Sequence, residues 1–222
     1  LAALPATRTL QVLEVIHQAY PEFIDGTSVL HTGLNNMGAI FHPALALLNA
    51  GRIESTRGDF QFYIEGVTPS VAEVLEALDR ERVTVAASLG IRARTAREWL
   101  RMAYDAGGSN LYEAIHNQRG YYGIQAPPTL YHRYITEDVP MSLVPIAALG
   151  QRYGVSVRGM DSIIRLACIA HRTDYWRRGR TPDRLGIGDF SVNELTQYVM
   201  EGGGSGVPSP YNNYEHTSET ST

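Results

Sequence analysis

A long apolar segment near the start of the chain, residues 27–51, carries polar side chains at regular intervals. His31, Asn35, His42 and Asn49 are spaced by four, seven and seven residues, so they would share one narrow face of an α-helix. The other faces are apolar, which is typical of a buried helix. An unpaired polar group in a protein core costs about 1–3 kcal/mol. We therefore expect this polar stripe to face hydrogen-bonding partners or a cleft.

Pro43 directly follows His42 inside this segment. A proline removes one backbone donor and clashes with the carbonyl four residues earlier, so the sequence predicts that the helix kinks or restarts there. A histidine beside such a break would have a fixed direction and access to a cavity. On this segment alone, two core histidines that bond to neighbouring helices are an equally good interpretation.

The composition excludes several kinds of chemistry. The 222-residue chain contains no lysine, so it has neither a Schiff-base lysine nor the lysine of a phosphate-binding loop. Cys168 is its one cysteine, which excludes an internal disulfide and a thiolate metal site. A free cysteine also fits a reducing compartment, so we expect a cytoplasmic protein.

Charge and hydropathy predict neither a nucleic acid nor a membrane as partner. The formal net charge is −4, and no basic stripe is present. No apolar run reaches the length of about eighteen residues that a membrane-spanning helix needs. The chain does not begin with methionine, which indicates a fragment or a processed start.

Helical periodicity recurs along most of the chain and predicts an all-α fold of about eight helices without an internal repeat. Thr95 with Glu98, and Ser191 with Glu194, have the spacing of capping boxes. Thr68 precedes a proline, which also favours a helix start. The predicted helices are 7–20, 27–42 with a continuation to 49, 68–89, 95–104, 110–117, 139–152, 160–171 and 191–200.

Two stretches between these helices have other patterns. Residues 60–64 alternate aromatic and other side chains and could form a short strand or an extended loop. Residues 119–140 are rich in Gly, Tyr and Pro, which predicts about twenty residues without regular helix. Long ordered loops of this kind are usually functional.

The composition changes abruptly after Glu201, to GGGSGVPSPYNNYEHTSETST. Residues 1–201 are therefore predicted to form the helical domain, and residues 202–222 a flexible Gly/Ser linker followed by a disordered tail. The GGGSG run resembles an engineered linker with an appended peptide, and a natural tail is the alternative.

The end of the 119–140 loop places an arginine and two acids just before a predicted helix. Asp138 is positioned to be an N-cap, where the helix dipole would keep it ionised. It could cap its own helix, orient a neighbouring histidine, or do both. Arg133 could bind a carboxylate through two parallel hydrogen bonds or simply lie on the surface.

Four stretches together carry a family resemblance: HTGLNNMGAIFHPALALLNAGRIE, FYIEGVTPSV, APPTLYHRYITEDVPMSLVPIAALG and RTPDRLGI. They resemble the C-terminal helical domain of the opine dehydrogenases, the octopine/nopaline dehydrogenase family. The similarity covers roughly residues 10–190 in order, and its His-Pro and Glu-Asp-Val elements are the most specific. It implies a multi-helix substrate domain of the 6-phosphogluconate-dehydrogenase C-terminal-like type.

The resemblance also implies an activity. Opine dehydrogenases condense an amino acid with an α-keto acid and reduce the imine with NADH or NADPH. The family's catalytic histidine falls on His42 and its partner acid on Asp138, a pair that needs no metal. The family's arginine falls on Arg133, which would hold a substrate carboxylate. In this role His42 would be the general acid and base, and Asp138 would fix its tautomer.

The sequence departs from the family pattern in two respects. Gly38, four residues before His42, replaces an asparagine of some members, and Asn35 is the nearest substitute for it on that face. The family's N-terminal Rossmann domain is also missing, because no G-x-G-x-x-G turn follows a strand. We therefore expect an isolated substrate domain, inactive alone and prone to form homodimers through exposed apolar patches.

Two other interpretations remain open at this point. The chain could be a helical scaffold that displays its C-terminal peptide, or the substrate domain of a related hydroxy-acid dehydrogenase. By either of the dehydrogenase interpretations, the acid/base chemistry would centre on His42, and His31 would be structural.

Overall fold

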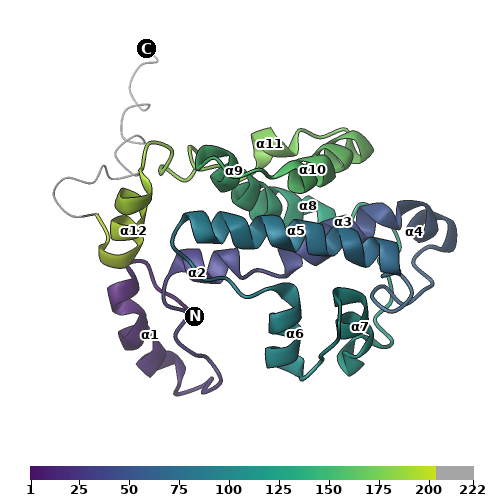
Figure 1. Cartoon of the computed structure of the whole chain (residues 1–222), viewed down its shortest axis with the longest axis horizontal. Helices are drawn as coiled ribbons and strands as arrows, with labels where there is room; N and C mark the ends of the chain where they lie inside the picture. The colour runs from purple at the N-terminus through teal and green to yellow at the C-terminus, as the bar shows by residue number, and fades with distance from the viewer. Residues whose placement is uncertain (204–222) are drawn as a thin grey trace, which may run out of the picture. The chain divides into compact units, whose positions relative to one another are not determined.

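The computed structural model describes residues 1–203 of the chain (Figure 1), so all but the first two residues of the predicted linker and tail lie outside the described part. Within residues 1–203 every regular element is helical, which confirms the all-α prediction. The described part of the chain divides into two compact units, residues 1–33 with residues 181–203, and Leu34–Arg180.

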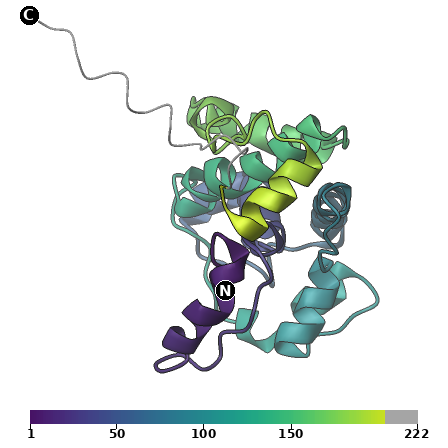
Figure 2. The same cartoon turned by 90° about the vertical axis from the view of Figure 1, so that its left-hand side faces the viewer.

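The first unit pairs the two ends of the described chain. The helix α12 begins at the predicted capping box, in which the Ser191 hydroxyl and the Glu194 carboxylate each accept a backbone N–H. It contacts η1, as Figure 2 shows. The elements of this unit are η1 (Ala6–Arg8), α1 (Thr9–Ile16), α2 (Val29–Leu34, whose last residue belongs to the second unit) and α12 (Val192–Glu201).

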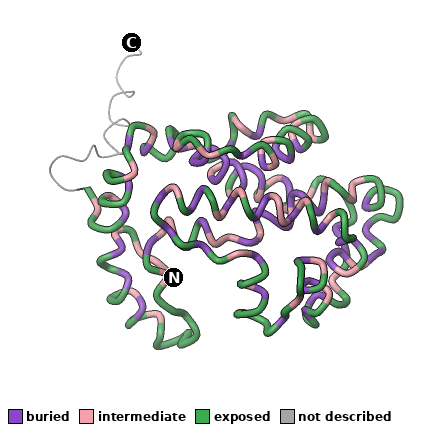
Figure 3. The backbone as a smooth tube through the Cα atoms, in the orientation of Figure 1, coloured by how far each residue is buried: buried purple, intermediate pink, exposed green. Residues whose placement is uncertain are grey.

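The second unit is built around α3 (Gly38–Leu48), which contacts α5, α8, α10 and η3. Ala39, Ile40, Ala44 and Leu45 of this helix are completely buried, and α3 and α5 lie side by side (Figures 1 and 3). The other elements of this unit are α4 (Ala50–Thr56), α5 (Pro69–Ser88), α6 (Ala96–Tyr104), α7 (Leu111–His116), η2 (Arg119–Tyr121), α8 (Arg133–Thr136), the π-helix η3 (Val139–Leu143), α9 (Val144–Arg152), α10 (Arg158–His171) and α11 (Tyr175–Arg178).

The predicted helix over residues 27–42 is wrong, because the chain breaks between α2 and α3. Asn36 causes the break: its Oδ1 accepts a hydrogen bond from the Gly38 backbone N–H at 3.0 Å, which starts α3. The amide nitrogen of Asn36 donates to the Ser142 hydroxyl at 3.1 Å, so the same side chain anchors the break to η3.

The helix does not restart at Pro43, the second of the two predicted outcomes, since α3 continues through it to Leu48. The proline costs one backbone hydrogen bond, which would have reached the carbonyl of Ala39. The apolar side chains of α3 are buried against several elements, and this burial holds the helix together across the missing bond.

Capping residues correctly predicted the starts of α5, α6 and α12. Thr68 accepts the N–H of Val71 at the start of α5, and Thr95 with Glu98 forms the predicted capping box of α6. The misses are short elements. The helices α4, α8 and α11 were not predicted, and α8 interrupts the stretch expected to lack regular helix. Residues 60–64 form turns with a single antiparallel bridge between Gln61 and Gln125.

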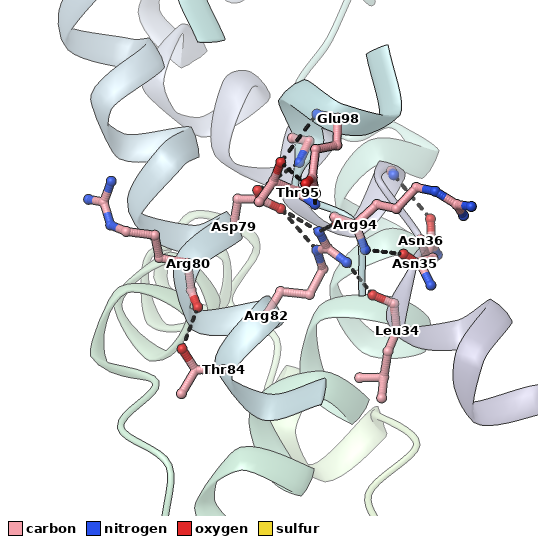
Figure 4. Close-up of polar contacts among 12 residues, drawn as sticks. Leu34, Asn35, Asn36, Asp79, Arg80, Arg82, Thr84, Arg94, Thr95 and Glu98 are labelled. Atoms are coloured by element: carbon pink, nitrogen blue, oxygen red, sulfur yellow. Dashed lines mark hydrogen bonds and ion pairs between the residues drawn. The ribbon is translucent and has the colours of Figure 1, made fainter. Parts of the chain in front are cut away.

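A buried ion pair in the second unit joins α5 to two other segments. The Arg82 side chain is 0% exposed and bonds to Oδ1 of Asp79 through Nη2 at 2.6 Å and Nε at 3.0 Å. It also donates to the carbonyl oxygens of Leu34 and Arg94 (Figure 4). The other oxygen of Asp79 accepts the N–H of Ala96 at 2.7 Å. The pair thus joins the end of α2, the middle of α5 and the start of α6.

Replacing Arg82 by methionine would leave a buried carboxylate and two carbonyls without their donor. Breaking a buried pair in this way is expected to lower the free energy of unfolding by about 3–5 kcal/mol. Denaturant unfolding measures the change, with Arg80→Met as the matched control, because Arg80 is on the same helix but 67% exposed and is expected to cost less than about 1 kcal/mol. Equal losses in the two variants would contradict this role.

A second buried contact joins α10 to α11. The Tyr175 hydroxyl lies 2.8 Å from Nδ1 of His171, and the tyrosine is 2% exposed. Burial lowers the pKa of His171 below the value of 6.5 that is usual for histidine. The folded protein therefore binds a proton at this ring less readily than the unfolded chain does.

This difference makes stability depend on pH. As the pH falls from about 7 to about 5.5, the unfolded chain protonates His171 before the folded protein does, so the free energy of unfolding decreases. Thermal unfolding across this range should show the decrease, and His171→Gln should reduce its slope. A variant with the wild-type slope would show that other groups cause the dependence.

Candidate acid–base site

His42 and Asp138 form the centre of the site. Nδ1 of His42 lies 2.8 Å from Oδ2 of Asp138, and the two side chains are 25% and 16% exposed. The pair forms because α3 packs against η3, directly after Asp138. With Nδ1–H donating to the carboxylate, the neutral ring presents its Nε2 lone pair as an acceptor, the arrangement of a general base.

Asp138 does not cap its own helix. It has helical backbone angles, and its side chain makes no capping hydrogen bond to the start of η3, so the N-cap prediction is wrong. The π-helix η3 begins directly after Asp138, at Val139, and the carboxylate contacts the His42 ring instead. Of the two uses predicted for this carboxylate, the structure shows the orientation of a histidine.

Tyr63 is the third member of the site, and the sequence did not predict it. Its hydroxyl lies 3.0 Å from Nε2 of His42. It belongs to the turns between α4 and α5, in the FYIEGVTPSV stretch, which carried part of the family resemblance but was otherwise considered only as a strand or loop. Aromatic alternation does not reveal a hydrogen bond to a residue 21 positions earlier, so only the fold identifies this contact.

Stacked aromatic rings hold these groups in place. Tyr134 of α8 stacks on the His42 ring, with centroids 4.3 Å apart and an interplanar angle of 23°. Phe62 stacks on the Tyr134 ring at 5.0 Å. Tyr121 stacks on Tyr63 at 4.1 Å and 12°. The rings of His42 and Tyr63 are therefore each held by at least one neighbouring ring.

The tyrosines near His42 are neutral phenols at physiological pH. Burial raises the pKa of Tyr63 well above its ordinary value of 10.0, and the nearby Tyr121, Tyr134 and Asp138 add to the increase. Burial likewise raises the pKa of Tyr121 and of Tyr134. These hydroxyls can donate and accept hydrogen bonds but do not supply a phenolate.

A cavity of ≈ 350 Å³ opens beside His42. Apart from His42, the residues that line this His42 cavity are uncharged at neutral pH. They are Asn35, Asn36, Met37, Gly38, Phe41, His42, Tyr63, Trp99, Tyr104 and Tyr121. A small organic molecule of mixed polarity would fit such a space, with His42 and Tyr63 as its acid/base groups.

Asn35 and Gly38 both lie on the wall of the His42 cavity. Oδ1 of Asn35 accepts the backbone N–H of Arg94 at 2.9 Å, which ties this wall to the segment before α6 (Figure 4). A Cβ added to Gly38 would lie 3.3 Å from Cε1 and Nδ1 of His42. Gly38 therefore leaves the imidazole space that a larger residue would restrict.

Arg133 lies apart from the lining of the His42 cavity. It is the first residue of α8, and its side chain is 67% exposed. Its Nε is 3.4 Å from Oε2 of Glu137, an exposed pair that contributes little to stability. Its assignment as a substrate clamp stays a prediction.

The other polar residues of the 27–51 segment have structural contacts. The Asn49 side chain donates to the carbonyls of Leu45 and Gly66, each at 3.0 Å. His31 lies in the first unit, with Nδ1 2.9 Å from the Ser28 hydroxyl. The broken helix thus separates the predicted stripe, and His42 is the member that meets a carboxylate.

A larger cavity of ≈ 420 Å³ lies between α5, α6 and α7. Its acidic lining residues bond within the fold: Glu76 to the Leu111 N–H, Asp79 to Arg82 and Ala96, and Glu98 to Thr95. Each carboxylate of this lining therefore has a partner within the protein.

The described residues contain neither a candidate metal site nor a candidate membrane-spanning helix. Within residues 1–203, no group of three or more His, Cys, Asp or Glu side chains is arranged to hold a metal ion. None of the helices there combines the length and apolar character that a bilayer crossing needs.

Comparison with known proteins identifies the family. Residues 25–171 match the family described as NAD/NADP octopine/nopaline dehydrogenase, alpha-helical domain. The chain belongs to this family, as its resemblance predicted, and the match is to the family's helical domain.

Named relatives agree with this assignment. An opine dehydrogenase from Arthrobacter sp. (strain 1C) is 37% identical over 198 residues, which cover 89% of this chain and 55% of the relative. A vitopine synthase from Allorhizobium ampelinum is 27% identical over 154 residues, covering 69% of this chain and 43% of the relative. The chain therefore spans about half the length of the relatives it matches.

Solved structures show the same fold. The structure of octopine dehydrogenase in complex with NADH and agmatine aligns with a TM-score of 0.67 at 23% identity, over 84% of this chain and 53% of that one. The structure described as ODH-NADH-L-arginine aligns with a TM-score of 0.65 at 22% identity, over 86% and 54%. These similarities confirm the multi-helix architecture predicted from the sequence.

Proposed function

We propose that this chain is the substrate-binding and acid/base domain of an opine dehydrogenase. Such an enzyme condenses the amine of an amino acid with an α-keto acid and reduces the resulting imine to a secondary amine. The observation that carries the proposal is the His42–Asp138 contact of 2.8 Å on the wall of a cavity. Relatives described as opine dehydrogenase and vitopine synthase support it.

The proposed cofactor is NAD or NADP, which supplies a hydride when it is bound. Related octopine dehydrogenase structures are described with NADH, with L-arginine and with pyruvate. The residues described in this chain do not fit the dinucleotide itself, because they contain no strand and hence no strand–turn–helix phosphate site. We therefore propose a Rossmann domain as partner and derive only proton transfers here.

In the proposed reaction His42 serves first as a base and then as an acid. The neutral ring accepts a proton at Nε2, and the resulting imidazolium donates one to the oxygen that leaves when the imine forms. Asp138 keeps the other proton on Nδ1 and stabilises the positive ring. A positioned acid/base group of this kind typically contributes about 10²–10⁴-fold to the rate.

Two further residues are proposed to bind substrate. Asn35 lines the His42 cavity. Arg133 has a guanidinium that suits a carboxylate, and its exposed pair with Glu137 would exchange at little cost.

Two properties of the whole protein complete the proposal. The single free Cys168 supports a cytoplasmic location. A homodimer is supported by apolar side chains that remain exposed, such as Leu166 and Ile169 of α10.

Replacing His42 by alanine in the enzyme that contains this chain and its dinucleotide-binding domain should remove turnover. We expect kcat to fall at least about 10²-fold, because the proton acceptor is lost, while cofactor affinity stays nearly unchanged. The assay follows nicotinamide oxidation with an amino acid and an α-keto acid, and cofactor affinity is measured by fluorescence titration.

His31→Ala is the control for this experiment, and its kcat should stay near that of wild type. A His42→Ala enzyme with normal kcat would contradict the assignment. Wild-type turnover with a hydroxy acid and oxidised cofactor alone, without an amine, would indicate a hydroxy-acid dehydrogenase instead.

A further inference from the structure

The hydroxyl of Tyr63 is hydrogen-bonded to Nε2 of His42, the ring nitrogen that would exchange a proton with a substrate. Nδ1 of the imidazole is engaged by Asp138 at 2.8 Å, which leaves Nε2 for exchange with a substrate. Nε2 in turn lies 3.0 Å from the Tyr63 oxygen. A substrate that exchanges a proton with His42 therefore either displaces this hydroxyl or uses it.

We propose that Tyr63 is a catalytic residue that relays protons between His42 and the substrate, an inference that rests on the opine dehydrogenase function proposed above. Tyr63 lines the His42 cavity although it is only 6% exposed, and its hydroxyl lies 3.0 Å from Nε2, so this residue contacts both the imidazole and the space for substrate. It would contact the reacting oxygen directly, and His42 would act through it.

The packing around Tyr63 favours relay over displacement. Its ring is stacked against Tyr121 at 4.1 Å and meets Phe62 edge to face at 5.3 Å. Moving the hydroxyl away from Nε2 would disturb both contacts, whereas a relay needs no movement of heavy atoms. Reacting groups held in place before substrate arrives also lower the entropic cost of the reaction.

The electrostatics around Tyr63 determine the kind of relay. Burial raises the pKa of its hydroxyl well above the ordinary value, so a free phenolate would be strongly disfavoured. The hydroxyl must then accept one proton as it gives up another. The imidazolium formed beside Asp138 can supply that proton.

The proposed relay acts in the dehydration of the carbinolamine that forms from the amine and the keto acid. The Tyr63 O–H bond breaks as its proton moves to the carbinolamine hydroxyl, and the Nε2–H bond of protonated His42 breaks as its proton moves to the Tyr63 oxygen. The C–O bond breaks and water leaves, while the nitrogen lone pair forms the C=N bond of the iminium. His42 ends neutral, Tyr63 ends unchanged, and no group is oxidised or reduced.

The test compares two Tyr→Phe variants of the enzyme that contains this chain and its dinucleotide-binding domain. Tyr63→Phe keeps the stacked ring and removes one oxygen. Tyr175→Phe is the matched control, because it removes a buried hydroxyl that lies 2.8 Å from another histidine, His171. We expect Tyr63→Phe to lower kcat about 10²-fold with little change in KM, and Tyr175→Phe to stay within about twofold of wild type.

A second measurement uses the wild-type enzyme and does not depend on a folded variant. If two protons are transferred in the same step, a plot of kcat against the deuterium fraction of the solvent curves downward. If only one proton is transferred, the plot is a straight line. A straight line, or a Tyr63→Phe variant with the kcat of wild type, would overturn the relay. If the wild type oxidises nicotinamide only in the presence of an amino acid, the proposed function stands even when the relay fails.

Discussion

The 2.8 Å contact between His42 and Asp138 joins residues 96 positions apart in the chain, and the second unit is arranged so that it can form. It requires α3 to lie against η3, with Asp138 turned inward and not toward its own helix. The Asn36 side chain helps to hold α3 against η3, because it accepts the Gly38 N–H at the start of α3 and donates to Ser142 in η3. The histidine is thus positioned by the same contacts that end one helix and begin the next.

Two features surround this pair: the buried Arg82–Asp79 ion pair and the His42 cavity, whose lining is uncharged apart from His42. Arg82 and Asp79 are buried, pair with each other and bond to backbone atoms of Leu34, Arg94 and Ala96, so both charges have partners. The His42 cavity itself is lined by aromatic and amide side chains. The carboxylate of Asp138, 2.8 Å from Nδ1, is the charge in direct contact with the imidazole.

Local chemistry made much of this fold predictable, and the exceptions have physical causes. Capping residues such as Thr95 and Ser191 fixed helix starts, because their hydrogen bonds are made within three residues. The break at Asn36 and the continuity of α3 through Pro43 depend on contacts with distant segments, which periodicity does not encode. His42 and Asp138 were predicted through the family resemblance, which included the stretch around Tyr63 but gave that residue no role, so the contact of Tyr63 with His42 is known from the fold.

The central claim is that His42 and Asp138 act as one acid/base unit, and a double-mutant cycle on kcat tests it most directly. His42→Ala, Asp138→Asn and the double variant would be compared with wild type in amino-acid-dependent turnover. If the carboxylate acts through the imidazole, the double variant should be no more than about threefold slower than His42→Ala alone. Losses that multiply in the double variant would show that the two residues act independently and would contradict the account.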